Sequence, residues 1–164
     1  QLQLTVSRVG EATPPTPGFE PRPLVPEDLL IEQRNSQILG QNLEAAGRPR
    51  PAEGYDPHHI LPSDKWAELD DMRQQFAEWG IDLNDAANGV WLPGSGAPSD
   101  AAGSYHERIH NSEYRRAVQR AFDGVTSHED ALATLDRIRT QLEAGTFPGS
   151  RPRVPKPPQD QPKP

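Results

Sequence analysis

The chain has 164 residues, enough for one domain, and its 33% hydrophobic content and 19 unevenly spread prolines indicate that part of it lies outside any packed core. Its net charge of -7 argues against a broad basic surface for nucleic acid, although it is compatible with a local basic groove. The absence of cysteine excludes disulfides and cysteine-based zinc sites, and no apolar run is long enough for a membrane span.

The first 26 residues are predicted to form a linker, because they contain a series of prolines from Pro14 onward. Alternation in residues 2–6 allows one short strand there, and a frayed chain end is an equally good interpretation. The chain begins with Gln1 and shows no signal peptide, so we expect it to be a processed or excised piece of a longer protein.

Residues 27–46 are predicted to form a helix, because Pro26 suits its start and Gly47 suits its C-terminal cap. Residues 54–61 have the pattern of a short strand or an extended loop. Residues 63–79 are predicted to form an amphipathic helix, because apolar residues recur there at intervals of three or four and so share one core-facing side. These residues are Trp66, Leu69, Met72, Phe76 and Trp79, with Ser63 as the expected N-cap.

The second half of the chain has the pattern of a turn and a short strand followed by two helices. The strand is expected within residues 81–93, and residues 94–103 are expected to be a flexible loop. Ser104 and Glu107 match a capping box, which predicts a helix over residues 104–123. Another helix, capped by Ser127 and with Gly145 after it, is predicted over residues 127–144.

From residue 147 to residue 164 the chain is again rich in proline and polar residues, and we expect a disordered tail. The folded domain is therefore predicted to span residues 27–146, between the linker at 1–26 and this tail.

Four of the five histidines fall into two groups. On a helix, the spacing of His106 and His110 places both imidazoles on one face, which suits two ligands of one metal ion; such a pair alone more often marks a solvated face. In an extended segment, adjacent His58 and His59 point to opposite faces. One of them can then bind a metal while the other accepts a proton. The order strand, strand, helix is that of a ββα-metal nuclease.

Residues 54–122 resemble the AHH family, a branch of the HNH/endonuclease VII-like nuclease superfamily. The resemblance rests on the run His58-His59-Ile60-Leu61-Pro62, on residues 80–93 with Asn-Asp-Ala-Ala-Asn-Gly-Val as the most specific part, and on His106, His110 and Tyr114. Pro57 stands where the family has alanine. The resemblance implies an α+β, mostly helical fold, with a small ββα-metal (HNH-like) core, additional flanking helices and disordered proline-rich ends.

The resemblance also implies a role for each histidine. His59 would be the general base that activates water, whereas His58, His106 and His110 would hold one divalent metal ion. Asn88 would hold the strand that carries the base.

Asp56 lies two residues before His58, on the same face of an extended segment, and is an alternative metal ligand. Tyr114 is expected to be either a core residue or a phosphate contact. Arg108 and Arg115 are expected to contact substrate, because the segment from residue 104 to residue 122 has more arginines than acidic residues. A solvated helix face would give the same charge pattern.

Three imidazoles suit Zn²⁺, Ni²⁺ or Mn²⁺, and Mg²⁺ becomes more suitable if Asp56 is a ligand. The expected activity is endonucleolytic hydrolysis of a nucleic-acid backbone, with DNA favoured over RNA. Domains that resemble this one are commonly toxin tips of secreted bacterial proteins. The resemblance therefore implies an N-terminal carrier protein, delivery into a target cell, action in its cytoplasm and a cognate immunity protein. Two alternatives are a structural zinc module without activity, in which four histidines hold the ion, and a secreted proline-rich interaction protein.

Overall fold

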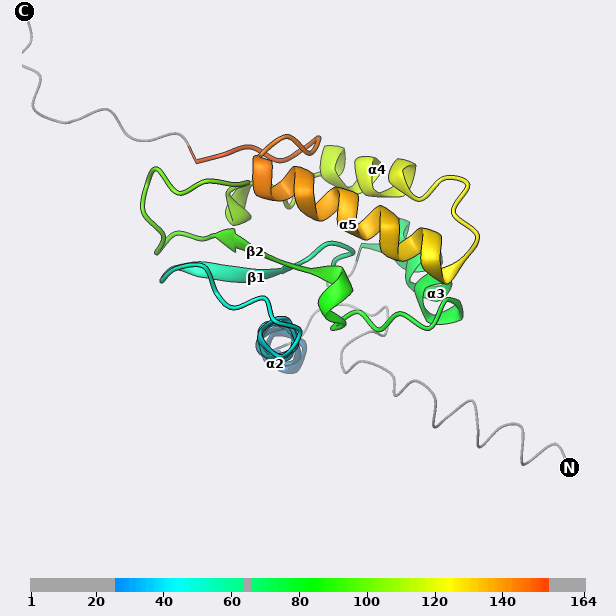
Figure 1. Ribbon diagram of the computed structural model, residues 1–164. Helices are drawn as coiled ribbons and strands as arrows, with labels where there is room; N and C mark the ends of the chain where they lie inside the picture. The colour runs from blue at the N-terminus through cyan, green and yellow to red at the C-terminus, as the bar shows by residue number, and fades with distance from the viewer. Residues whose placement is uncertain (1–25, 64–65, 154–164) are drawn as a thin grey trace, which may run out of the picture.

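Figure 1 shows the computed structural model, which describes residues 26–63 and 66–153. Residues 1–25 of the predicted linker and residues 154–164 of the predicted tail lie outside the described residues. The elements follow one another in the order α2 (Pro26–Ala45), β1 (Tyr55–His59), η1 (Ala67–Leu69), α3 (Asp70–Glu78), η2 (Ala86–Asn88), β2 (Gly89–Pro93), η3 (His106–Arg108), α4 (Ser112–Ala121) and α5 (His128–Ala144), where η marks a 3₁₀ turn.

The two strands form an antiparallel sheet in which His58 pairs with Val90 and His59 pairs with Gly89. In Figure 1, helix α2 lies on one side of this strand pair and helix α5 lies on the other. Gly89 permits the close approach of α2, because a Cβ at this position would lie 2.7 Å from Leu39 Cδ1. The sheet thus places adjacent residues of β1 in two different environments.

The larger core cluster is built from the apolar faces of α3, α4 and α5 together with strand β2, and it includes Phe76, Val90, Tyr114 and Leu135. A smaller cluster joins Leu39 and Leu43 of α2 to Trp91. The predicted α+β class, with a small strand pair and flanking helices, is confirmed. No helix within the described ranges is both long enough and apolar enough to cross a bilayer.

Two predicted helices have their expected caps. Helix α5 begins after Ser127, whose hydroxyl accepts a hydrogen bond from the Asp130 amide, and it ends at Gly145 in a left-handed conformation with φ 74°. Helix α2 ends at Ala45, and Gly47 follows it with φ 81°.

The predicted helix over residues 104–123 is wrong in its first turns. His106 lies in the short turn η3, and α4 begins only at Ser112. The cap of α4 is Asn111, whose side chain accepts from the Tyr114 amide at 2.9 Å. Ser104 does not cap this helix, which begins eight residues later, and its hydroxyl donates to the Ser150 hydroxyl at 2.8 Å. The capping-box prediction failed because a distant segment binds this serine.

The predicted helix over residues 63–79 is shorter than expected. The helical segment begins with η1, which has Trp66 at its N-cap position, and continues as α3 from Asp70 to Glu78, which has Leu69 at its N-cap position. Ser63 caps neither element. The apolar residues of this helix still face the core as predicted, because Leu69, Met72 and Phe76 are buried. Residues 64–65 lie outside the described residues.

Residues 147–153, which we expected in the disordered tail, pack on the domain. Phe147 is 3% exposed, and the Tyr105 amide donates to the Arg151 carbonyl at 2.8 Å. Gly149 has φ 77°, and a Cβ there would lie 2.3 Å from the Tyr114 nitrogen. This segment therefore belongs to the folded domain, beyond the boundary predicted at residue 146.

Candidate metal centre and active site

Three histidines from separate parts of the chain converge beside strand β1. His58 comes from β1, His106 from η3, and His110 from the loop before α4. One ring nitrogen of each lies within 4.8 Å of those of the other two. Because a Zn²⁺–imidazole bond is about 2.0–2.1 Å long, small ring rotations would let the three nitrogens share one ion.

The segment that carries His106 and His110 is a 3₁₀ turn followed by a loop rather than an α-helix, and other contacts hold it in place. Ile109, between the two histidines, is completely buried. The Asn111 amide group donates to the Arg108 carbonyl at 3.0 Å and to the Gly149 carbonyl at 2.7 Å. These anchors place the two imidazole centroids 5.3 Å apart, the neighbouring arrangement that we had expected from a helix.

His58 is oriented by Tyr114. The Tyr114 hydroxyl donates its hydrogen to the Ile60 carbonyl at 2.7 Å, so its 3.0 Å contact with His58 Nε2 must use the hydrogen on the imidazole. Nδ1 of His58 is then the ring nitrogen without a hydrogen. Burial lowers the pKa of His58 well below its ordinary value, and nearby His106 and His110 lower it further. His58 is therefore a neutral ring with a nitrogen suited to a metal ion.

His106 is oriented in a similar way by Asp56. The His106 Nδ1 atom lies 3.4 Å from Asp56 Oδ2, which leaves Nε2 as the nitrogen for a metal ion. Asp56, whose side chain is 51% exposed, is not part of the group of possible ligands found among the described residues. The Asp56 carboxylate contacts Nδ1 of His106, and from this position it can orient the His106 ring.

The donor set fits a divalent metal ion. Three imidazoles suit Zn²⁺, Ni²⁺ or Mn²⁺ better than Mg²⁺, which prefers oxygen ligands. His58 is neutral, and in both His58 and His106 the second ring nitrogen bonds to a protein group, as is usual for metal-binding histidines. A set of three ligands also leaves a fourth position open.

His59 faces the other side of the strand and does not join this group. Its Nε2 atom lies 2.8 Å from Asn84 Oδ1, which can only accept, so Nε2 carries the hydrogen and Nδ1 can accept a proton. Burial lowers the pKa of His59 to about 4, against the opposing effect of the Asn84 hydrogen bond. At neutral pH the ring is therefore uncharged.

Asn88 fastens the segment that follows His59. Its Oδ1 atom accepts from the Leu61 amide at 2.8 Å, and its amide group donates to the carbonyls of Leu61 and Leu83. Its own carbonyl accepts from the Ile60 amide at 2.8 Å. These bonds join residues 60 and 61 to the turn η2 that carries Asn88.

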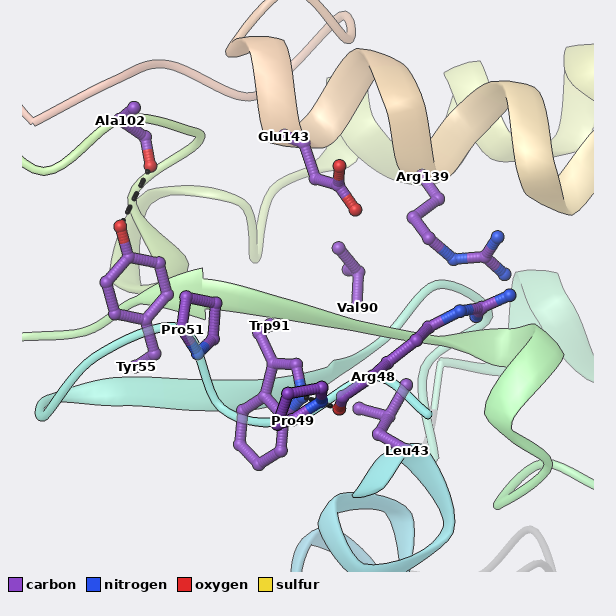
Figure 2. Close-up of a pocket in the computed structure, with 10 residues that line it drawn as sticks. All are labelled: Leu43, Arg48, Pro49, Pro51, Tyr55, Val90, Trp91, Ala102, Arg139 and Glu143. Carbon is purple, nitrogen blue, oxygen red and sulfur yellow. Dashed lines mark hydrogen bonds between the residues drawn. The ribbon is translucent and has the colours of Figure 1, made fainter. Parts of the chain in front are cut away.

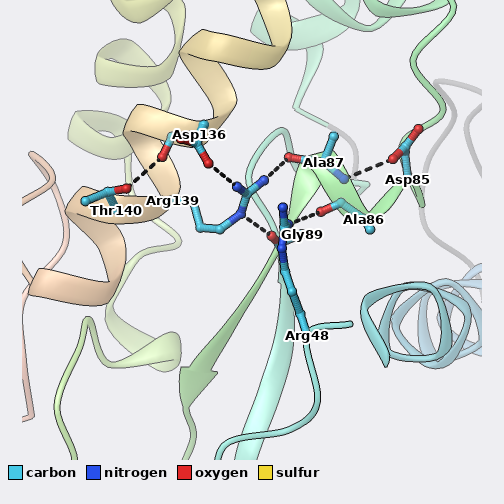
Figure 3. Close-up of polar contacts among 8 residues, drawn as sticks. All are labelled: Arg48, Asp85, Ala86, Ala87, Gly89, Asp136, Arg139 and Thr140. Carbon is cyan, nitrogen blue, oxygen red and sulfur yellow. Dashed lines mark hydrogen bonds and ion pairs between the residues drawn. The ribbon is translucent and has the colours of Figure 1, made fainter. Parts of the chain in front are cut away.

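Figure 3 shows two arginines that support the turn around Asn88 and that the sequence reasoning missed. Arg139 of α5 donates to the carbonyls of Ala87 and Gly89, at 2.7 and 3.1 Å. Arg48 donates to the Ala86 carbonyl at 3.1 Å. A signal was present for Arg139, since it lies on the buried face of a predicted amphipathic helix, where a charged residue needs partners.

The predicted substrate contacts differ in their surroundings. Tyr114 is completely buried and bonded as described above, so the structure corrects its assignment as a phosphate contact in favour of the core alternative. Arg115 lies over the Trp66 ring, 4.0 Å from its centroid, and forms an ion pair with Glu68 at 3.3 Å. Arg108 is exposed on η3, in the same segment as the possible metal ligands His106 and His110.

A pocket of about 300 Å³ lies between the end of α2, strand β2 and helix α5, as Figure 2 shows. Its lining includes Tyr55, Trp91 and Arg139. None of the four clustered histidines lines it. This pocket is therefore separate from the candidate active site.

The model of a family described as a nuclease family of the HNH/ENDO VII superfamily with conserved AHH matches residues 39–142. No curated protein and no solved structure matches the chain. The matched span contains all four histidines described above, together with Asn84 and Asn88.

Proposed function

Because the chain belongs to the AHH family of the HNH/ENDO VII nuclease superfamily, we propose that it is a metal-dependent endonuclease that hydrolyses phosphodiester bonds. The observation that supports this proposal is the separation of His59 from the three-histidine group. His58, His106 and His110 would hold the ion, and His59 would accept a proton from the attacking water.

In the proposed reaction, the oxygen of a water molecule attacks the phosphorus while Nδ1 of His59 takes a proton from that water. A new P–O bond forms, and the bond to the departing ester oxygen breaks. A bound divalent ion would supply Lewis-acid stabilisation of the charge that develops on the phosphate and on the leaving oxygen. Asn88 would keep the segment after His59 in place during this step.

The low pKa of His59, about 4, keeps the ring neutral but also makes it a weak base. The negative charge of a phosphate beside the ring would favour its protonated form and raise this pKa toward the working pH. Substrate binding would therefore strengthen the base at the time when it is needed.

The open fourth position of a three-histidine site favours catalysis over the structural alternative, in which four histidines would close the coordination shell. We further propose DNA, in preference to RNA, as the substrate. Exposed Arg108 next to the ligands supports contact with a backbone phosphate.

The biological role that we propose is that of a toxin domain. The resemblance to bacterial toxin tips and the proline-rich composition of residues 1–26 support attachment to an N-terminal carrier. The domain would be secreted or delivered into a target cell, act in its cytoplasm and be neutralised by an immunity protein.

The test is cleavage of plasmid DNA and of total RNA by the purified chain, with Mg²⁺, Mn²⁺, Ni²⁺, Zn²⁺ or EDTA, beside His59→Ala. His128→Ala is the matched control, because this exposed histidine bonds to the Trp79 carbonyl, outside the proposed site. Cleavage that requires metal, disappears in His59→Ala and persists in His128→Ala would support the proposal.

Tight zinc binding without cleavage under any condition would instead favour the structural zinc module. The absence of both metal binding and cleavage would favour the proline-rich interaction protein.

A further inference from the structure

The hydrogen-bond partner of His59 is an asparagine, Asn84, and not another histidine. Asn84, in the turn before η2, is 4% exposed, and its Oδ1 atom accepts from His59 Nε2 at 2.8 Å. His59 and Asn84 are 25 residues apart in the sequence. They meet because the pairing of β1 with β2 brings the turn before β2 next to β1. The orientation of the Asn84 amide therefore decides which nitrogen of His59 carries the hydrogen.

Helix α2 holds Asn84 at two points. The Asn84 amide group donates to Asn35 Oδ1 at 3.2 Å, and Asn42 donates to the Asn84 carbonyl at 2.6 Å. Asn35 and Asn42 are seven residues apart, so they lie on the same side of the helix, two turns from one another. Asn35 is completely buried. Figure 1 shows α2 on the side of the strand pair opposite to α5.

An amide has a donor end and an acceptor end, so while Asn35 presents its oxygen to Asn84, the bond to Asn35 constrains the bond to His59. With its NH₂ group on Asn35, Asn84 presents oxygen to His59, and the neutral ring must carry its hydrogen on Nε2. If the amide turned around, its NH₂ group would face His59, and the hydrogen would move to Nδ1. The nitrogen that accepts a proton from water would then be lost.

We propose that Asn84 is a positioning residue for the general base, and that Asn35 on α2 fixes its amide so that His59 keeps the Nε2–H tautomer. This inference rests on the proposed role of His59. It gives the helix at residues 26–45 a role in the active site, although Asn35 lies before the span matched by the family model.

The test combines nitrogen NMR of the His59 imidazole with cleavage kinetics, for wild type, Asn84→Ala, Asn35→Leu and Asn35→Asp. Asn35→Leu removes the acceptor at similar volume, whereas Asn35→Asp keeps an oxygen for the Asn84 amide. Gln37→Ala is the matched control, because Gln37 is exposed on the same helix. Thermal unfolding and zinc titration check the fold and the metal site of every variant.

We expect the Nε2–H tautomer in wild type, Asn35→Asp and Gln37→Ala, and a mixture of tautomers in Asn84→Ala and Asn35→Leu. In these last two, kcat should fall by about 10- to 100-fold with zinc affinity unchanged, since loss of an orienting partner has effects of this size. If Asn84→Ala does not fold, the two Asn35 variants provide the same comparison.

The inference would be overturned if folded Asn35→Leu kept the wild-type tautomer and the wild-type kcat. It would also be overturned if Asn35→Asp and Asn35→Leu lost kcat equally. The NMR measurement needs no activity. A wild type that shows the Nε2–H tautomer but does not cut nucleic acid would therefore refute the proposed function, while Asn35→Leu would still test the orienting bond.

Discussion

Adjacent residues on the two faces of strand β1 have different neighbours. His58 lies among other imidazoles, with ring centroids 5.2 Å from His106 and 6.1 Å from His110. His59 faces an amide, Asn84, that is held by helix α2. Burial lowers the pKa of both rings, but only on the His58 face do further histidines form a group that can hold an ion.

This comparison shows how a very small sheet can place two adjacent histidines in different surroundings. Because the side chains of a strand alternate, two histidines in sequence point to opposite faces without any loop between them. The supporting elements differ accordingly. Tyr114 of α4 orients the ring on one face, and α2 supports the ring on the other face.

The largest expected difference between the faces concerns zinc affinity. His106→Ala should weaken zinc binding by more than about 100-fold, because losing a group that only orients a ligand already costs about 10- to 100-fold. His59→Ala should leave the affinity nearly unchanged, since His59 lies outside the ligand group. Isothermal titration of metal-free protein measures both. Equal losses in the two variants would show that the four histidines form one closed site.

Without metal, His58 and His59 should both make the free energy of unfolding depend on pH, because burial lowers the pKa of each. Below the ordinary histidine value of 6.5 the unfolded chain takes up protons at both positions, whereas His59 in the fold stays neutral until about pH 4. The unfolded state therefore binds more protons in this window, and the free energy of unfolding should fall as the pH drops from 6.5 to 4, by about 3 kcal/mol for His59 alone.

Urea unfolding across this pH range measures the effect. His59→Gln should remove part of the slope, and a slope unchanged by this substitution would contradict the prediction.

A smaller effect is expected from Tyr114→Phe on the metal face. The variant loses the bond to the Ile60 carbonyl and leaves buried His58 Nε2 without its acceptor, which should cost about 1–3 kcal/mol of stability. Thermal and urea unfolding measure the loss. In the control Tyr105→Phe, the lost bond goes to Glu107, which is exposed, so its cost should be below about 1 kcal/mol. Equal costs would argue against the buried bonding of Tyr114.

The smallest effect should follow Asp56→Asn. Asn keeps an oxygen that can accept from His106 Nδ1, and the site is half exposed, so zinc affinity should fall by less than about 10-fold. Asp100→Asn, on an exposed loop, is the charge-matched control for the same titration. A loss as large as that of His106→Ala would identify Asp56 as a ligand rather than an orienting group.

Local patterns in the sequence were sufficient for several elements. The alternation at His58 and His59, the apolar spacing of α3 and α5, and the caps at Ser127 and Gly145 are each decided within a few residues, and the structure has them as expected. The family resemblance, which depends on short motifs, is confirmed by the match over residues 39–142.

What the sequence could not reveal are contacts between distant residues. The capping-box pattern at Ser104 was sound locally, but Ser150 binds that hydroxyl, and Asn111 caps the helix instead. In the sequence, Asn84 is recognisable only as part of a motif, because its hydrogen-bond partners His59 and Asn35 lie 25 and 49 residues away. A local sequence pattern contains no information about partners that only the fold brings close.

The return of residues 147–153 to the domain changes where the domain ends. A cut after residue 146 would leave the Tyr105 amide and part of the Asn111 side chain without their hydrogen-bond partners, next to both ligand histidines of that loop. Gly149, although it follows the last helix in a proline-rich stretch, sits against the Tyr114 backbone with no room for a side chain. The shortest piece that keeps these bonds therefore extends to Arg151, and residues with the composition of a spacer are subject to the steric constraints of a core.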